Sequence, residues 1–541
     1  MERDVTVVIA VYNTMPYLTE CLTSLLGQSI GADRMEVVAV DDGSTDGSGK
    51  ELDRFAQLHP DLVRVIHQPN SGGPAAPSNR ALDVATGRYV FFLGSDDHLG
   101  PEALERLVAA ADEHGTDVVV GRMVGLNGRW VPQAVFERTR HDATLRNSPL
   151  PWALSNTKLF RRALVERHGL RFPEDLPILS DQPFTLEACF RAERISILAD
   201  YDYYFAVRRG DASNVTYRGS LEDRLRGTER IMRLTERHTD SLDARHGLNR
   251  RHLTTELAGV LGAGLLALDR DTQQRICDGA GRLVADYGTE ALLGRIPLSD
   301  RVHLLLARAG ALDELLAALR FEQRSGVLHE ELPHTVVDGR FYPAYPFLGR
   351  PGLGIEDHHL DLTASVCRSL TDLRAALETT DGRPYLRITG RSPRAGYGAL
   401  VTRARVRTER TPADPAPAAA PAPDPDPAAD PETELRFEPA ADGGTRLSVR
   451  VPLGELAREA LAEPGRWLVR LHLDTTVGPR EFTVPADPSA RALTLWQGVR
   501  PYRIVPVRGP QGRQSLAAGP LDVGRIVAQR LRRLAAVPGR K

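Results

Sequence analysis

The sequence has few cysteines, and their placement excludes two common ways of stabilising a domain. Only 4 of the 541 residues are cysteine, and they are Cys21, Cys189, Cys277 and Cys367. They lie far apart, with no Cys-x-x-Cys pair and no histidine cluster beside them. This spacing argues against a zinc site and a disulfide framework. We therefore predict four reduced, buried thiols.

The sequence also lacks an excess of charge of one sign and a long apolar run. Lys and Arg number 69 against 71 Asp and Glu, a formal net charge of −2, so no global positive field would gather nucleic acid. The longest apolar stretch, near residues 259–268, is about half of the roughly 18 to 20 residues that cross a bilayer. The N-terminal residues MERDVTVVIAVYN lack a long apolar segment behind a basic start, so we expect no signal peptide. We expect a cytoplasmic protein with at most peripheral contact with the inner face of the membrane, and no nucleic-acid partner.

What the sequence does contain divides into three regions. Residues 1–218 alternate β-rich apolar runs (VTVVIAV, EVVAVDD, VRVIHQ, RYVFFLG, DVVVGR) with helical segments such as YLTECLTSLLGQ, which predicts an α/β fold with a mainly parallel sheet. Residues 219–350 have helical apolar spacing, as in LTTELAGVLGAGLLALDR and VHLLLARAGALDELLAALR, and predict a helical linker. Residues 351–541 carry short β-like runs from DLTASV to EFTVP, typical of an immunoglobulin-like β-sandwich.

Two segments of the last region depart from the β pattern. Residues 411–432 include 8 Pro, 8 Ala and 4 Asp, a composition that cannot bury a core and predicts a disordered loop. The final segment, VGRIVAQRLRRLAAVPGRK, is a candidate basic amphipathic helix. We expect it to form a solvated face or an oligomer contact, with membrane-surface binding as the alternative.

Polar residues follow two of the predicted strands. VTVVIAVYN and EVVAVDDGSTDGS each end in side chains that leave a parallel sheet at its carboxyl edge, where ligands bind in such sheets. Asp41 and Asp42 stand at the second of these ends, before a turn of Gly, Ser and Thr. Alone, DDGS is as well explained by an Asx turn that caps the next helix. Its pairing with the VYN strand favours a ligand crevice.

A second constellation lies in QPNSGGPAAPSNRALDVATGRYVFFLGSDD. A loop with Gly72 and Gly73 precedes a helix, and the next strand ends in Ser95, Asp96 and Asp97. Two carboxylates at a strand end suit a hard cation such as Mg²⁺ or Mn²⁺, with a nucleotide diphosphate as the further ligand. Capping of the helix PEALERLV by Asp97 is the competing explanation, and both can hold.

Together these residues resemble an inverting glycosyltransferase of family 2, which has the GT-A fold. The resemblance rests on VVIAVYN, DDGSTDGS, NSGGP…SNRAL…ATGRYVFFLGSDD and a later LSDQPF, and it covers roughly the first 215 residues. It implies transfer of a sugar from a UDP-sugar donor to an acceptor hydroxyl, with Mn²⁺ or Mg²⁺ as cofactor.

The resemblance also implies roles for individual residues. Asp181, in LSDQPF, would be the catalytic base, and Asp96 would ligate the metal. Asp41 would accept the N3–H of uracil, and Asp97 would support the metal or contact the donor sugar. The full set expected to contact the donor is Ala10, Tyr12, Asp41, Asn70, Arg80, Asp97, Arg208 and Arg209.

Three positions depart from the family's pattern. Gly94 stands where relatives often have an Asp, Ser78 where many have Arg, and Ser180 where Glu commonly precedes the catalytic Asp. Metal ligation then depends on Asp96, and donor binding by the 70–80 loop has less support. These departures leave open a catalytically degenerate scaffold or binding protein.

The order of a GT-A domain, a helical linker and a sandwich-like region resembles wall teichoic acid glycosyltransferases, which transfer N-acetylglucosamine (GlcNAc) to poly(ribitol phosphate). The resemblance implies a homotrimer formed through the C-terminal region, and a polyanionic or glycan acceptor. A capsular or exopolysaccharide enzyme is the alternative. A sugar nucleotidyltransferase is disfavoured because no Gly-rich, basic loop follows the first strand. A polyanion needs a local basic surface, for which the candidates are Arg161, Arg162, Arg167, His168, Arg171, Arg250 and Arg251.

Overall fold

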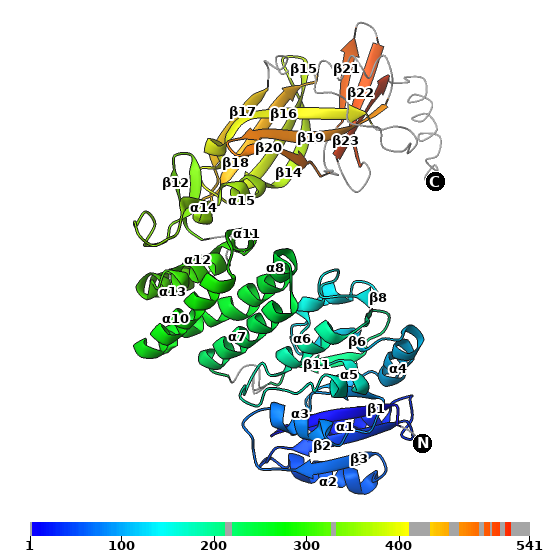
Figure 1. Cartoon of the computed structure of the whole chain (residues 1–541). Helices are drawn as coiled ribbons and strands as arrows, with labels where there is room; N and C mark the ends of the chain where they lie inside the picture. Colours follow the sequence, from blue (N-terminus) through cyan, green and yellow to red (C-terminus); the bar gives the residue numbers. More distant parts are fainter. Residues whose placement is uncertain are drawn as a thin grey trace, which may run out of the picture. The chain divides into compact units, whose positions relative to one another are not determined.

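The computed structural model describes residues 3–210, 219–325, 332–410, 433–453, 465–485, 492–497, 500–508 and 514–520. The chain divides into two compact units, one of residues 1–331 and 345–359 and the other of residues 332–344 and 360–541 (Figure 1). The helical linker thus shares a unit with the N-terminal domain. The 411–432 loop and the candidate C-terminal helix lie outside the described residues, so both stay predictions, as do the domain boundaries at 218 and 350.

An eight-stranded sheet forms the core of the first unit, in the order β3-β2-β1-β4-β9-β6-β10-β8. β1 pairs in parallel with β2 and β4, β2 with β3, and β6 with β10, whereas β8 and β9 are antiparallel to their neighbours. Its strands are β1 (Val5–Val11), β2 (Met35–Asp41), β3 (Val63–His67), β4 (Tyr89–Phe92), β6 (Val118–Gly121), β8 (Arg140–Ala143), β9 (Leu159–Arg161) and β10 (Ile195–Leu198). The predicted mainly parallel α/β fold is confirmed. The three residues of β9 are too few to give a sequence signal.

Helices cover this sheet because each has one apolar stripe. In α1 the buried residues Leu18, Cys21, Leu22 and Leu25 recur at three and four spacing. The helices of this domain are α1 (Tyr17–Leu26), α2 (Ser48–Leu58), α3 (Ala75–Leu82), α4 (Ala103–His114), α5 (Arg162–Arg167) and α6 (Asp181–Arg191), with 3₁₀ turns η1 (Gln133–Phe136) and η2 (Leu150–Trp152). A small sheet of β5 (His98–Leu99), β11 (Tyr204–Val207) and β7 (Met123–Leu126) adjoins them.

The strand register sets where the polar strand ends meet. Val11 pairs with Asp41 across β1 and β2, and Val8 pairs with Phe92 across β1 and β4. Because all three strands run in parallel, their carboxyl ends emerge at one edge of the sheet. The VYN, DDGS and GSDD segments are therefore brought together.

The linker is helical, as predicted, but glycines interrupt its two apolar runs. Residues 302–320 form two helices because Gly310, with φ +66°, ends the first. Residues 253–270 form short turns because glycine disfavours a continuous helix. The elements are α7 (Leu221–His238), α8 (Leu242–Arg251), the π-helical turn η4 (His252–Leu257), α9 (Ala258–Val260), η5 (Ala263–Ala267), α10 (Arg270–Tyr287), α11 (Glu290–Leu293), α12 (Leu298–Arg308) and α13 (Leu312–Ser325).

The second unit contains two antiparallel sheets. One has the order β14-β15-β18-β17, and the other has β16-β19-β23-β22-β21 with β20 beside β19. Buried residues from both sheets, such as Ile388 and Leu471, belong to one hydrophobic core, which confirms the predicted sandwich. The strands are β14 (Thr371–Thr380), β15 (Arg383–Ser392), β16 (Val401–Arg410), β17 (Glu434–Pro439), β18 (Thr445–Pro452), β19 (Gly465–Thr475), β20 (Gly478–Thr483), β21 (Leu493–Gln497), β22 (Arg500–Arg508) and β23 (Gln514–Pro520).

One β-like run of this region is not a strand. DLTASV begins α15 (Thr363–Arg368), because the Asp361 carboxylate accepts the Thr363 amide N–H at 2.8 Å and so starts a helical turn. The remaining elements are the hairpin β12 (His334–Val337) and β13 (Arg340–Pro343), α14 (Asp357–Leu360) and η6 (Tyr397–Leu400).

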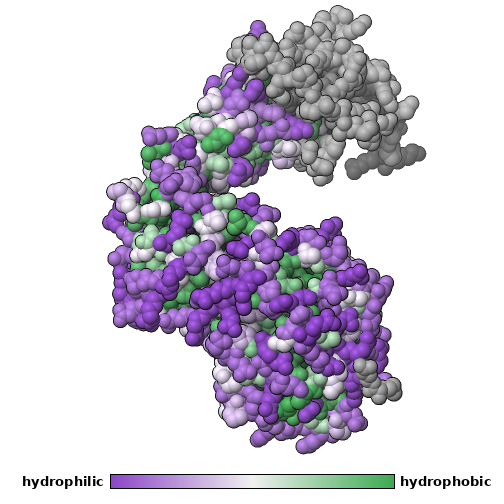
Figure 2. Space-filling model, viewed as in Figure 1, coloured by the Kyte–Doolittle hydropathy of each residue, from purple (hydrophilic) through white to green (hydrophobic). Residues whose placement is uncertain are grey.

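The surface and the cysteines agree with the composition. All four cysteines are free and buried, as predicted. On the face in Figure 2, hydrophobic residues are scattered among hydrophilic ones. Within the described residues, no helix combines the length and the apolar character that a membrane span requires.

Candidate active site

A cleft of about 500 Å³ opens at the carboxyl edge of β1, β2 and β4. No sequence pattern indicates the shape of this cleft, but the predicted site residues include much of its lining. Seven of the ten predicted donor, metal and base residues line this cleft, and they are Ala10, Tyr12, Asn70, Asp96, Asp97, Asp181 and Arg209. The paired strand-end carboxylates and Asp181 therefore share one cavity, although 84 or more positions separate them in the chain.

The other three predicted donor residues do not line the cleft. Arg80 is exposed on α3, and Arg208 is exposed beyond β11. Asp41 is buried and accepts hydrogen bonds from the Ser44 N–H at 3.0 Å and from His67 Nδ1 at 2.9 Å, which raises the pKa of His67. Successive side chains of a strand point to opposite faces, so the next residue, Asp42, lines the cleft in its place.

Asp42 holds the glycine-rich loop at the side of the cleft. Its carboxylate accepts the Ser71 N–H at 3.0 Å and the Gln68 side-chain amide at 2.6 Å, and its carbonyl accepts from Asn70 Nδ2 at 3.0 Å. Gly43 permits this approach, since its φ is +77° and a Cβ there would lie 2.8 Å from the Asn70 nitrogen. The second Asp of DDGS thus has a defined structural role that sequence reasoning did not assign.

Asp96 and Asp97 lie side by side but have different partners. Arg209 Nε donates to Asp96 Oδ2 at 2.7 Å, and both side chains are largely buried. Asp97 accepts from the Tyr204 hydroxyl at 2.5 Å and from the Val207 N–H at 2.7 Å. Burial and the neighbouring Asp96 carboxylate raise the pKa of Asp97. Asp97 is therefore held by the protein, whereas Asp96 and Arg209 form the charged wall of the cleft.

This donor set fits a hard divalent cation. Carboxylate oxygens are the protein ligands that Mg²⁺ and Mn²⁺ prefer. Two adjacent buried carboxylates concentrate negative charge, and the raised pKa of Asp97 shows the cost of that charge. A cation beside Asp96 would lower this cost.

The structure explains why Gly94 stands where relatives often have an acid. A Cβ at this position would lie 2.6 Å from Asp97 Oδ2 and 3.1 Å from the Tyr204 hydroxyl. The Gly94 N–H also donates to that hydroxyl at 3.1 Å. Tyr204 and Asp97 thus fill the space that a further side chain would take.

Asp181 begins α6 and lines the same cleft. The preceding loop contains Leu179 in the left-handed region, with φ +58°, a conformation that costs a bulky residue of order 1–3 kcal/mol. Leu179 packs on Gly227 of α7, where a Cβ would lie 3.1 Å away. Burial raises the pKa of Asp181 to about 6, Glu256 adds to this, and Lys158 opposes it. A carboxyl group with such a pKa is suited to general-base work near neutral pH.

Several lining residues carried no sequence signal. Arg129 follows a turn at Asn127 with φ +53°, and residues 155–157 precede the short strand β9. Tyr204 lies in the apolar strand β11, where an aromatic residue is not by itself a sign of a site. Only the fold brings these side chains to the cleft, because none belongs to a local motif.

Most of the predicted basic surface is neutralised. Four of the seven predicted residues pair with carboxylates: Arg161 with Asp117, Arg162 with Glu166, Arg171 with Asp83, and Arg251 with Glu256. Guanidinium groups paired in this way offer less charge to a polyanion.

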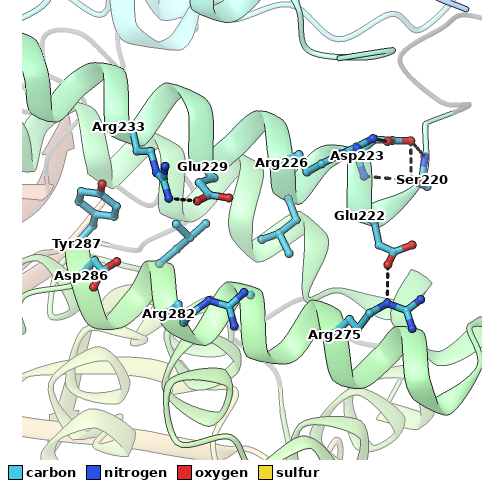
Figure 3. Close-up of a pocket in the computed structure, with 13 residues that line it drawn as sticks. Ser220, Glu222, Asp223, Arg226, Glu229, Arg233, Arg275, Arg282, Asp286 and Tyr287 are labelled. Atoms are coloured by element: carbon cyan, nitrogen blue, oxygen red, sulfur yellow. Dashed lines mark hydrogen bonds and ion pairs between the residues drawn. The ribbon is translucent and has the colours of Figure 1, made fainter. Parts of the chain in front are cut away.

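Two further clefts border the linker helices and differ in charge. One, between α7 and α10, is lined by four arginines and four acids, and three of the ion pairs are visible in Figure 3: Arg226 with Asp223, Arg233 with Glu229, and Arg275 with Glu222. The other, of about 500 Å³, has Arg146, Arg250, Arg295 and Asp243 as its charged residues. There the Arg250 guanidinium lies 5.9 Å from the centre of the Trp152 ring. The second cleft is the basic one.

A helix-covered, mainly parallel sheet with paired carboxylates at one strand end and a buried carboxyl group across the cleft defines the GT-A class of nucleotide-sugar glycosyltransferases. The comparisons with known proteins agree. Residues 6–169 match the model of glycosyl transferase family 2, and residues 222–319 match that of the glycosyl transferase TarS linker domain. The chain belongs to glycosyl transferase family 2.

Two curated relatives show the extent of the likeness. A poly(ribitol-phosphate) beta-glucosyltransferase of Bacillus spizizenii is 38% identical over 226 residues, which are 40% of this chain and 36% of that protein. The poly(ribitol-phosphate) beta-N-acetylglucosaminyltransferase TarS of Staphylococcus aureus is 41% identical over 203 residues, or 38% and 35% of the two chains. The matched segment spans about a third of the length of these relatives.

Solved structures extend the likeness of fold. The crystal structure of S. aureus TarS aligns with 96% of this chain and 86% of its own, with a TM-score of 0.62 and 24% identity, which shows a shared fold. TarS residues 1–349 in complex with UDP-GlcNAc align at 30% identity and a TM-score of 0.53, over 63% of this chain and 97% of that one. The same fragment with UDP aligns over its whole length, at 30% identity and a TM-score of 0.53, and over 65% of this chain.

Proposed function

We propose that this protein is a metal-dependent inverting glycosyltransferase that moves a sugar, with GlcNAc as first candidate, from a UDP-sugar to a hydroxyl of poly(ribitol phosphate) in wall teichoic acid. The observation that carries the proposal is the single cleft that holds the Asp96–Arg209 pair on one side and Asp181 on another. A donor diphosphate and an acceptor hydroxyl need these two kinds of group within one cavity.

The donor half of the cleft has the groups that a nucleotide diphosphate requires. Ala10 lies near the end of β1 and Tyr12 directly follows that strand, and Asn70, on the loop held by Asp42, lines the same cleft. Arg209 presents an always-charged, planar donor beside Asp96. A divalent cation held by Asp96, with support from Asp97, would neutralise the leaving diphosphate.

The acceptor half depends on Asp181. In an inverting transfer, one carboxylate removes the proton of the attacking hydroxyl, and the leaving diphosphate needs no second carboxylic acid to protonate it. Burial raises the pKa of Asp181 to about 6, which is high enough for it to take up that proton and still low enough for it to be ionised at neutral pH.

The acceptor assignment has two supports. The two curated relatives described above are named as poly(ribitol-phosphate) glycosyltransferases. One transfers a glucosyl group, and the other transfers N-acetylglucosamine. The basic cleft with Arg146, Arg250 and Arg295 offers the local positive surface that a polyanion needs. A trimer through the C-terminal region remains a prediction, which light scattering of the purified full chain tests.

The donor site is tested by thermal unfolding with UDP, UDP-GlcNAc, UDP-glucose and a GDP-sugar, each with Mn²⁺ and with EDTA. A UDP-sugar at 100 times its Kd should add about 2.7 kcal/mol to the free energy of unfolding. We expect this gain with Mn²⁺ only, and its loss in Asp96→Asn. A nucleotide gain that survives both EDTA and Asp96→Asn would refute the metal site, and no gain with any nucleotide would favour the degenerate scaffold.

The base is tested by Asp181→Asn, which should lower kcat by roughly 10² to 10⁴ with little change in UDP binding. Asp175→Asn, an exposed carboxylate of the same loop, is the matched control and should retain the wild-type kcat. Normal turnover in Asp181→Asn would eliminate Asp181 as the base.

The same residue should also set the pH dependence. Because protonated Asp181 cannot act as a base, kcat should fall below pH about 6. A raised folded-state pKa favours the protonated form, so ionisation destabilises the fold as the pH rises through 6. Asp181→Asn should therefore raise the melting temperature relative to wild type more at pH 8 than at pH 4.

The acceptor surface is tested by Arg250→Gln, which removes one cation from the basic cleft. We expect a several-fold higher KM for poly(ribitol phosphate), a weaker dependence of that KM on salt, and an unchanged KM for the UDP-sugar. Arg282→Gln, in the charge-balanced cleft of Figure 3, is the control. Equal effects of the two substitutions would mean that the basic cleft does not bind the polymer.

A further inference from the structure

A closed triangle of buried side chains lies directly behind Asp181. Gln182 Nε2 donates to Glu256 Oε1 at 2.8 Å, and one amino group of Arg251 donates to Gln182 Oε1 at 2.8 Å. The other amino group of Arg251 pairs with Glu256 Oε1, also at 2.8 Å. Each of the three residues is less than a tenth exposed. Two linker residues thus hold the residue that follows Asp181 on α6.

The place of these two linker residues in the fold is unusual. Arg251 ends α8, and Glu256 lies in the π-helical turn η4 that follows. π-Helical turns are rare and occur frequently at functional sites. Here the turn directs Glu256 and Arg251 together onto the amino end of α6.

Packing alone does not account for a buried ion pair at this position. Removing two charges from water costs several kcal/mol per ion, and well-packed apolar residues of similar volume often stabilise a fold as well or better. Among the described residues, none hydrogen bonds with the Nε of Arg251, so the pair is not fully compensated there. The two charges bring a fixed field to Asp181 that apolar residues would not.

The other charged and titratable groups around Asp181 come from several elements. Lys158, just before β9, is buried and donates to the Ser155 carbonyl at 2.5 Å, and burial lowers its pKa to about 8. His252 lies behind Arg251 and hydrogen bonds to Thr235, and burial holds its pKa well below the usual range. Cys189 of α6 lies near Lys158, and Asp223 of α7 lines the same cleft. Among these neighbours, Glu256 disfavours a negative Asp181, whereas Lys158 and Arg251 favour it.

We propose that Arg251 and Glu256 are positioning residues through which the helical linker fixes the amino end of α6, and with it the Asp181 carboxylate, for proton removal from the acceptor. The inference rests on the proposed function, since it takes Asp181 as the base. The linker would then take part in catalysis in two ways. Its hydrogen bonds to Gln182 hold the amino end of α6, and the charges of Arg251 and Glu256 act on the Asp181 carboxylate.

The two charges make opposite contributions, which gives the test its direction. Glu256→Gln keeps the shape of the side chain and removes a negative neighbour of Asp181, which should lower the pKa of Asp181. The acid limb of the kcat profile, which is the fall of kcat at low pH, should therefore move to lower pH. Arg251→Gln removes a positive neighbour, so the limb should move to higher pH. Each shift should be up to about one pH unit. The double variant should return the limb toward its wild-type position, with a lower kcat.

The experiment measures kcat of sugar transfer by the full chain from pH 4.5 to 9 at saturating UDP-sugar and acceptor. UDP binding and thermal unfolding establish that each variant is folded. Arg275→Gln, which breaks the exposed linker ion pair with Glu222, is the matched control and should leave the limb in place. Should Arg251→Gln not fold, the isosteric Glu256→Gln decides the question alone.

Two results would contradict the inference, and they are distinguishable. If the variants fold and keep the wild-type acid limb and kcat, the triangle of Gln182, Arg251 and Glu256 serves packing only. The proposed function would then still stand. A wild-type enzyme without an acid limb, or without transfer, would remove Asp181 as the base, and the inference would fall with the proposed function.

Discussion

Three carboxylates, Asp96, Asp97 and Asp181, share one largely desolvated cleft, and the rest of the site is arranged to make that concentration of charge tolerable. Asp97 is stabilised by a tyrosine hydroxyl and a backbone amide, Asp96 by Arg209, and Asp181 by the nearby cations Lys158 and Arg251. The same desolvation also suits these three carboxylates to their proposed chemistry. An acidic wall suits a cation, and a base with a pKa near 6 operates at neutral pH.

The helical linker is part of this arrangement. α7 packs beside α6 (Figure 1), and Gln182 of α6 hydrogen bonds with Arg251 at the end of α8 and with Glu256 of η4. Leu179 packs on Gly227 of α7 in the same region. A segment that the sequence alone describes as a spacer therefore supports the loop and the helix that carry Asp181. Residues 222–319 of this segment match the model of the glycosyl transferase TarS linker domain.

The sequence predicted the parts of the site that depend on local pattern. Strands such as β1 and β4 are continuous apolar runs with polar ends, and their parallel pairing brings Tyr12 and Asp96 to one edge. Asp181 was found through the resemblance of LSDQPF to a family motif. These features depend on residues that are close together in the sequence, so they can be recognised before the fold is known.

What could not be predicted depends on the direction of single side chains and on long-range packing. Asp41 and Asp42 are equivalent in the sequence, but the alternation of a strand turns only Asp42 toward the cleft. Tyr204 belongs to an apolar strand, and no local pattern indicates that its hydroxyl donates to Asp97. Arg161 and Arg171, in the predicted basic clusters, form ion pairs with carboxylates more than forty positions away, which offset their positive charge. No periodicity encodes such pairings.

The measurement that tests the central claim most directly is transfer itself. The full chain would be incubated with UDP-GlcNAc, Mn²⁺ and a synthetic ribitol phosphate oligomer, and the product analysed by mass spectrometry and by NMR of its anomeric proton. The account predicts an oligomer that carries a β-linked sugar, because inversion converts the α-linked donor. Failure to consume any UDP-sugar with this acceptor, or an α-linked product, would contradict it.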